Sequence, residues 1–313
     1  LEDLGYLPRI AFNLDKTFKK CCACGKQALT MCMGFGCNAA GIVGCRIIDS
    51  PRERLIAMIT NSFVPCNGRF PILIAIIAMF FSGGGVKSAL ILTALVVLGI
   101  GMTFLVSKLL SMTVLKGQPS SFTLELPPYR RPAIGRIIVS SVFDRTLFVL
   151  GRAAAVAAPA GLIIWIFANV NIGGASLLNI CCTALDAPAR FIGLDGVILM
   201  AFILGFPANE TVIPIMVMAY MATGSITAVT DLTAVRHLLL DNGWTWLTAV
   251  NTMIFTLMHW PCSTTLLTVK KETGSKKWTF AAFAVPALCG AVLCFAVTWI
   301  VRIFAYIAGL PIL

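Results

Sequence analysis

Long apolar runs separated by short, basic connections dominate the pattern of hydrophobic and polar positions along this 313-residue chain. Two runs, at 86–110 and about 279–306, are apolar over nearly their whole length and predict transmembrane helices, because roughly 20 apolar residues in a helix cross the hydrocarbon layer of a bilayer. A third such helix is predicted at about 153–169. Ile and Val at helical spacing beside arginines within 133–150 indicate an interfacial amphipathic helix that precedes it.

Four other apolar runs are interrupted by glycine, proline and polar residues. One short phrase occurs twice in them, as Met-Gly-Phe-Gly-Cys-Asn at 33–38 and as Leu-Gly-Phe-Pro-Ala-Asn at 204–209. Each phrase has a later partner in which proline precedes cysteine, at 65–66 and at 261–262. Matching broken segments in two halves of a membrane protein indicate a transport site near the bilayer midplane. The interrupted runs are 27–48, 55–81, 196–221 and 244–269.

The sequence therefore predicts an all-α, polytopic transmembrane domain with two pseudo-repeats that contain broken or re-entrant helices. Basic loops favour the cytoplasmic side of a membrane. Re-entrant hairpins at 27–48 and 244–269 would place all basic loops on that side, and 170–195 is expected to be an extramembrane loop. The expected organisation has four parts. A cytoplasmic interfacial segment (1–26) precedes the first repeat (27–110). A linker with the amphipathic helix, the transmembrane helix and the extramembrane loop (111–195) precedes the second repeat with the terminal helix (196–313).

Composition restricts the class of protein further. Hydrophobic residues make up 58% of the chain and charged residues 12%, whereas soluble domains have about 45–50% and about 25%. The net charge of +11 comes from Lys and Arg in the connections, so it indicates membrane orientation and no nucleic-acid partner. The chain also opens without an initiator Met or a signal peptide, which suggests a fragment of a longer protein.

Three of the twelve cysteines, Cys37, Cys66 and Cys262, stand at helix-breaking residues. A break frees carbonyl groups, and a thiol beside it is able to coordinate a soft or borderline divalent metal. The alternative is that these cysteines are small, buried packing residues. Their similar placement in both halves favours a metal path.

The second phrase ends in Asn209-Glu210, and Glu210 is the one acidic residue deep in an apolar run. An intramembrane carboxylate indicates a functional site, either for a divalent cation or for a proton, and the alternative is a structural pair with Arg69. Asn38 and Asn209 are candidates either for oxygen ligands or for groups that hold the freed backbone. His259 remains open between a ligand, a pH sensor and a hydrogen-bonded structural residue.

Five ordered phrases, together with two shorter ones at 1–6 and 125–130, resemble the membrane domain of the bacterial ferrous iron transporter family FeoB over nearly the whole chain. The resemblance implies two Gate repeats, a multi-pass protein of the bacterial inner membrane, and uptake of Fe²⁺. It places the gating cysteines of the family on Cys37, Cys66 and Cys262. The phrases are Met-Gly-Phe-Gly-Cys-Asn (33–38), Asp-Ser-Pro-Arg-Glu-Arg-Leu (49–55), Pro-Cys-Asn-Gly-Arg-Phe-Pro (65–71), Gly-Phe-Pro-Ala-Asn-Glu (205–210) and His-Trp-Pro-Cys-Ser-Thr-Thr-Leu (259–266).

The resemblance also implies partners. Family members carry an N-terminal GTP-binding domain that uses GTP and Mg²⁺, but this chain has neither a phosphate loop nor the guanine-reading Asn-Lys-x-Asp. The chain is therefore expected to be a transport domain without enzymatic activity or a resident cofactor. Small cytoplasmic accessory proteins and the lipid bilayer are further expected partners, and a homo-oligomer is compatible with this class.

Other functions remain open. The metal set expected from sequence comprises Cys37, Cys66, Cys262, Asn38, Asn209 and Glu210. In a Gate-type carrier of an organic solute such as a nucleoside, the cysteines would be incidental. In a membrane regulator or scaffold, nothing would be transported. A Cu⁺ transporter would use Cys and Met alone, but Glu210 and the family phrases favour a harder ion.

Overall fold

The predicted all-α class is confirmed in the computed structural model. The described part of the chain is helical apart from one two-stranded antiparallel β-ladder. The chain divides into two compact units, each assembled from three segments. Unit 1 comprises Leu1–Cys66, Leu98–Val156 and Ser263–Ala284, and unit 2 comprises Asn67–Val97, Ala157–Cys262 and Val285–Leu313. The structure describes residues 6–81, 85–117, 135, 139, 147–172, 174–221 and 232–309.

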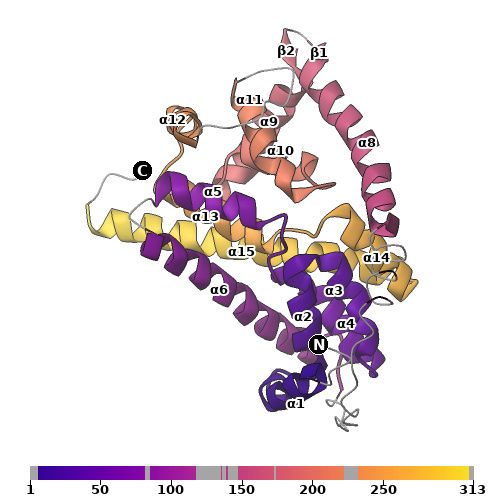
Figure 1. The fold of residues 1–313 in the computed structure, drawn as a ribbon. Helices are drawn as coiled ribbons and strands as arrows, with labels where there is room; N and C mark the ends of the chain where they lie inside the picture. Colours follow the sequence, from indigo (N-terminus) through magenta and orange to yellow (C-terminus); the bar gives the residue numbers. More distant parts are fainter. Residues whose placement is uncertain are drawn as a thin grey trace. The chain divides into compact units, whose positions relative to one another are not determined.

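Unit 1 combines early helices of the chain with one late helix (Figure 1). Helix α14 packs on α3, and a bidentate ion pair between Arg46 and Glu272, at 2.8 and 2.7 Å, joins the same region. An apolar cluster around Phe18 and Met31 packs against Phe104. The helices are α1 (Tyr6–Lys19), α2 (Lys26–Gly36), α3 (Asn38–Gly44), η1 (Cys45–Ile47), α4 (Pro51–Thr60), η2 (Asn61–Phe63) and α14 (Ser263–Thr273).

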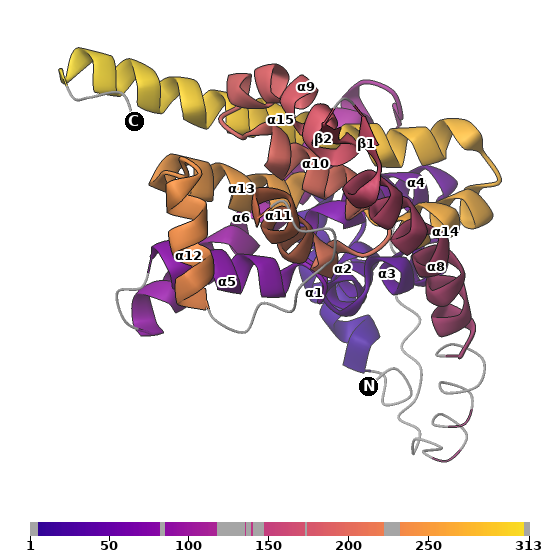
Figure 2. The same cartoon turned by 90° about the horizontal axis from the view of Figure 1, so that it is seen from above.

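Unit 2 combines late helices of the chain with one early helix. Figure 2 shows α5 beside α13, and α12 also packs on α5. The ring of Phe80 in α5 stacks on Trp244, with ring centroids 5.7 Å apart. The elements are α5 (Phe70–Phe80), β1 (Asn171–Ile172), β2 (Ala175–Ser176), α9 (Leu177–Phe191), α10 (Gly196–Leu204), η4 (Asn209–Thr211), α11 (Val212–Met221), α12 (Leu232–Asp241) and α13 (Trp246–Met258).

Three long helices contribute to both units: α6 (Gly85–Met112), α8 (Leu147–Asn169) and α15 (Lys276–Ile307). Helices α6 and α15 are long and apolar enough to cross a bilayer, so the helices predicted at 86–110 and 279–306 are confirmed. The helix predicted at 153–169 lies within α8. The predicted amphipathic helix at 133–150 falls largely outside the described residues.

The expectation of a loop at 170–195 was wrong over most of that range. After the short β-ladder, α9 runs from Leu177 to Phe191, and its N-cap Ser176 accepts a hydrogen bond from the backbone of Asn179. Asp186 and Pro188, two of the residues that suggested a loop, lie within this helix, where Asp186 pairs with Arg190 one turn later at 2.7 Å. Asp195, another of them, is the N-cap of α10. Helices α9 and α10 together are apolar and long enough for a broken span or a re-entrant loop, and they are bent by 111°.

Helix α1 lies in the predicted interfacial segment and ends with a cysteine where glycine is usual. Cys22 has φ 58°, its N–H donates to Lys19 O at 3.0 Å, and the next N–H, of Ala23, donates to Phe18 O at 3.1 Å. These two bonds are the Schellman motif, in which a left-handed residue closes the last turn of a helix. Ala23 and Phe18 also share the apolar cluster that accompanies this motif.

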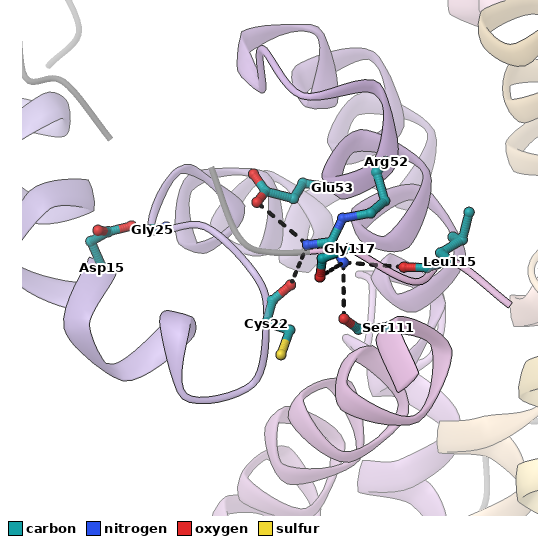
Figure 3. Close-up of polar contacts among 8 residues, drawn as sticks. All are labelled: Asp15, Cys22, Gly25, Arg52, Glu53, Ser111, Leu115 and Gly117. Atoms are coloured by element: carbon teal, nitrogen blue, oxygen red, sulfur yellow. Dashed lines mark hydrogen bonds and ion pairs between the residues drawn. The ribbon is translucent and has the colours of Figure 1, made fainter. Parts of the chain in front are cut away.

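Arg52, at the start of α4, holds this turn (Figure 3). Its guanidinium donates to Cys22 O at 3.4 Å, to Ser111 Oγ at 2.9 Å, and to the carbonyl oxygens of Leu115 at 3.1 Å and Gly117 at 2.9 Å. One side chain therefore connects the α1–α2 turn and the beginning of α4 with the C-terminal end of α6.

Replacing Cys22 with glycine is expected to raise the free energy of unfolding by about 0.5–1 kcal/mol. Glycine removes the cost of about 1–2 kcal/mol that a non-glycine residue has in the left-handed region, but it loses more conformational entropy on folding, which offsets part of this stabilisation. Thermal unfolding in detergent would measure the change. Cys21→Gly is the matched control, because Cys21 has no positive φ, and it should lower stability slightly. Equal shifts in the two variants would contradict this explanation.

The neighbouring Cys24 is a packing residue. It is buried, and burial followed by the charge of Glu53 raises the pKa of its thiol to about 12. Without a bound metal ion, the thiol is therefore protonated at neutral pH.

Candidate functional site

The two repeated phrases break their helices in the same way. Helix α2 ends at Gly36, Cys37 is extended with φ −153° and ψ 123°, and α3 begins at Asn38. In the second phrase, Ala208 is extended with φ −149° and ψ 112°, directly before η4 begins at Asn209. The predicted correspondence of the phrases therefore appears in the backbone. The counterpart of Cys37 is an alanine, so the thiol occurs only in the first phrase.

The two Pro-Cys phrases are also breaks. After α4 and η2 the chain is extended at Val64 and becomes α-helical again in α5. After α13 it is extended at His259 and becomes helical again in α14. In both cases a buried helix ends one turn or less before the proline, which leaves carbonyl groups without helical partners.

The chain passes between the two compact units at the same point of both Pro-Cys phrases. Unit 1 gives way to unit 2 directly after Cys66, and unit 2 gives way to unit 1 directly after Cys262. Helix α5, which follows the first Pro-Cys phrase, therefore belongs to unit 2, with the earlier helices of the second predicted repeat. Helix α14, which follows the second phrase, belongs to unit 1, with the earlier helices of the first predicted repeat. The repeat boundaries at 27–110 and 196–313 remain a prediction.

In unit 1, Asn38 holds the freed backbone. With its amide nitrogen turned towards the main chain, Asn38 donates to the carbonyl oxygens of Gly34, Asn61 and Val64, each at 3.3 Å. The Asn61 amide in turn donates to Asn38 O at 3.2 Å. Both side chains are buried, where an unsatisfied carbonyl is costly. These contacts describe a pinning role of the Asn38 amide nitrogen, and the role of its oxygen as a ligand stays a prediction.

In unit 2, Arg69 performs the corresponding task. Its guanidinium donates to Leu257 O at 2.8 Å, His259 O at 2.9 Å and Trp260 O at 3.3 Å. Arg69 is fully buried, with no exposed surface. The guanidinium therefore caps the end of α13 and satisfies the carbonyl groups that its break releases.

His259 and Asn209 come together in the same unit. The Nε2 atom of His259 lies 3.3 Å from Asn209 Oδ1, and both side chains are buried. Next to them, Glu210 is exposed and lies against the backbone of Gly68, where an added Cβ would be 3.0 Å from Glu210 Oε2. The absence of a side chain at Gly68 makes room for this carboxylate beside the first Pro-Cys phrase.

The predicted metal set is divided between the units. Cys37, Asn38 and Cys66 belong to unit 1, and Asn209, Glu210 and Cys262 belong to unit 2. Cys37 is exposed, Cys262 is partly exposed and Cys66 is buried. The described residues contain no group of three or more His, Cys, Asp or Glu side chains that could hold a metal ion. The set as a whole therefore remains a prediction.

One residue of the site was not identified from the sequence, and the partners of another were not specified by it. Asn61 was not recognised as the partner of Asn38, although it opens the polar island that ends α4. Arg69 was expected to be paired or close to water, and the structure gives it three backbone carbonyl acceptors. An arginine within an apolar run was the available signal, but its acceptors lie 188 to 191 residues further along the chain.

Broken apolar helices in two corresponding halves define a Gate-type helical membrane protein. A family model named Gate, described as nucleoside recognition, matches residues 1–80 and 150–276. A second model, described as ferrous iron transport protein B C terminus, matches residues 92–144.

Curated relatives specify the family. The Fe(2+) transporter FeoB of Staphylococcus aureus strain COL is 32% identical over 306 residues, which cover 94% of this chain and 44% of the relative. The protein of the same name from Salmonella typhimurium strain LT2 is 35% identical over 192 residues, which cover 61% of this chain and 24% of the relative. The chain belongs to the FeoB family. It spans less than half the length of these relatives, and no solved structure matches it.

Proposed function

We propose that the chain forms the membrane permeation path of a ferrous iron uptake protein. The observation that carries this proposal is that the chain passes from one compact unit to the other at both Pro-Cys phrases. The chain also belongs to a family whose curated members are named Fe(2+) transporters. The same names do not favour the carrier of an organic solute, the alternative that the Gate segments left open.

The proposed path uses thiols and oxygen atoms at the breaks. Cys66 and Cys262 adjoin the points where the chain changes unit, and Cys37 is the extended residue of the first phrase. Thiolate groups suit a borderline ion such as Fe²⁺, or they act as a redox-sensitive gate. Glu210 contributes negative charge and Asn209 an amide oxygen, while Asn38 acts by holding the break of unit 1. Fe²⁺ is the substrate in this scheme, and the chain needs no cofactor of its own.

The longer protein supplies the energy in this proposal. We place it in the bacterial inner membrane as a multi-pass protein, with the basic connections on the cytoplasmic side. A GTP-binding domain outside this chain, which uses GTP and Mg²⁺, would drive transport, and small cytoplasmic proteins would assist it. Homo-oligomers are compatible with this arrangement.

Uptake of radiolabelled Fe²⁺ under anaerobic, reducing conditions tests the proposal. Cells would carry the protein encoded by its whole natural gene, either unchanged or with Cys66→Ser. We expect the unchanged protein to take up iron and Cys66→Ser to reduce uptake by about tenfold or more. Loss of a group that only hydrogen-bonds to a metal ligand already lowers metal affinity by about tenfold or more, and loss of a ligand should have at least this effect. Cys45→Ser is the matched control, because Cys45 is a fully buried thiol of the same unit that donates to Gly41 O and lies away from both prolines.

Three outcomes have distinct meanings. Uptake lost in Cys66→Ser but kept in Cys45→Ser supports iron as the cargo and the thiol as part of the path. Unchanged uptake in Cys66→Ser keeps the cargo but overturns the role of this thiol. Absence of uptake by the unchanged protein overturns the proposed function.

A further inference from the structure

Cys37 is the pivot between two helices of unit 1. Its backbone N–H donates to Met33 O of α2 at 3.1 Å, and its carbonyl oxygen accepts from Gly41 N of α3 at 3.0 Å. Cys37 itself is extended, whereas α2 ends directly before it and α3 begins directly after it. The residue is exposed. The direction of its side chain therefore follows from the angle at which α2 and α3 meet.

The side-chain amide of Asn61 lies between these two helices. A Cβ at Gly34 of α2 would be 3.0 Å from Asn61 Oδ1 and 3.2 Å from Asn61 Nδ2. A Cβ at Gly41 of α3 would be 2.6 Å from the same Nδ2 and 2.9 Å from the same Oδ1. Such distances are too short for a well-packed Cβ, so glycine at both positions leaves the room that the amide fills. Asn61 is therefore a spacer that sets how closely α2 and α3 approach.

Asn61 is held in this position by a reciprocal pair of hydrogen bonds. Its Nδ2 atom donates to Asn38 O at 3.2 Å, and the Asn38 amide donates in return to Asn61 O at 3.3 Å. Asn61 begins η2 directly after α4, so a third helix carries the group that separates α2 from α3. Only 1% of the residue is exposed, which leaves the amide no path into solvent. The pair acts one residue away from Cys37.

We propose that Asn61 is a positioning residue for the Cys37 thiol, because its amide holds α2 and α3 at the angle that directs this thiol towards the transported ion. This inference rests on the proposed function, in which Cys37 belongs to the iron path. It assigns Asn61 a role in transport although its side chain is no ligand. Groups that orient a metal ligand typically change metal affinity by about 10–100-fold when they are lost.

The concentration dependence of Fe²⁺ uptake under anaerobic, reducing conditions tests this role. Cells carry the protein encoded by its whole natural gene, and uptake is normalised to the amount of protein in the membrane. We expect Asn61→Ala to raise the KM for Fe²⁺ by about tenfold. In a Cys37→Ser background the same change should have no further effect, because no thiol remains to be positioned. Equal effects in the two backgrounds would mean that Asn61 acts independently of Cys37, and would overturn the proposal.

A glycine variant keeps the proposal testable if Asn61→Ala does not fold. Gly34→Ala leaves Asn61 in place but presses a Cβ against its amide, so it should also raise the KM by about tenfold. Gly36→Ala is the matched control, because a Cβ at Gly36 would meet nothing within 4 Å although this residue adjoins Cys37. Its KM should equal that of the unchanged protein. The same KM in both glycine variants overturns the proposal.

Alkylation of Cys37 by N-ethylmaleimide measures the positioning without any transport. Cys32 is an exposed thiol of α2 that precedes the pivot, so its rate in the same purified protein is the internal reference, with both sites quantified by peptide mass spectrometry. We expect Asn61→Ala and Gly34→Ala to raise the rate of Cys37 relative to Cys32 by about threefold or more, the scale of one lost hydrogen bond. An unchanged ratio in both variants overturns the proposal.

The two proposals fail separately. Iron uptake by the unchanged protein, with the same KM and the same Cys37 alkylation rate in Asn61→Ala, removes the positioning role and leaves the proposed function intact. A Cys37 alkylation rate that depends on Asn61, in a protein that takes up no iron, overturns the proposed function and keeps Asn61 as the residue that positions this thiol.

Discussion

Replacing Arg69 with methionine is expected to lower the free energy of unfolding by about 3–5 kcal/mol, because removal of one member of a buried polar network leaves its partners uncompensated. The methionine would fill a similar volume but donate no hydrogen bond. Three carbonyl groups at the end of α13, those of buried Leu257 and His259 and of partly buried Trp260, would lose this donor. Thermal unfolding in detergent would measure the loss.

Two further variants define the cause. Arg236→Met removes an exposed arginine from α12 in the same unit and should change stability by less than about 0.5 kcal/mol. Arg69→Lys keeps the charge but not the planar fork that reaches three acceptors, so its loss should be intermediate. If Arg69→Met unfolds at the same temperature as Arg236→Met, the guanidinium does not hold the break.

Gly196→Ala is expected to separate α10 from α9, at a cost of about 3 kcal/mol. A Cβ at position 196 would lie 1.9 Å from Cys182 O and 2.9 Å from the backbone nitrogen of Asp186. Both neighbours are backbone atoms of a helix, so neither is able to give way by a side-chain rotation. The 111° bend of this helix pair therefore depends on the close approach at Gly196.

Alkylation of Cys182, which is buried against this contact, would report the separation as a faster reaction, together with a lower unfolding temperature. Gly161→Ala is the matched control, because a Cβ at Gly161 in α8 would meet nothing within 4 Å. Alanine at that helix position should be neutral or stabilise by about 0.5–1 kcal/mol. Similar behaviour of the two variants would exclude tight packing at Gly196 as the origin of the bend.

Local sequence determined where the helices run and where they break. Long, predominantly apolar runs became α6 and α15, and glycine or proline phrases became the breaks before Asn38 and Asn209. These features follow from residues close together in the chain, because a helix depends on bonds between residues four positions apart. The segment 177–191 was predicted as a loop because Asp186 and Pro188 are common in loops, although both fit on a capped helix.

The tertiary structure decided which groups satisfy the broken backbone. The sequence placed Arg69 in an apolar run, but the carbonyl groups that it binds lie on α13, at the other end of the chain. It also left Asn38 open between two roles, and only the fold brings the carbonyl groups of Gly34, Asn61 and Val64 to its amide. The exchange of α5 and α14 between the compact units is likewise a property of the chain path. Buried polar groups require partners wherever the fold provides them, and spacing along the chain does not encode that choice.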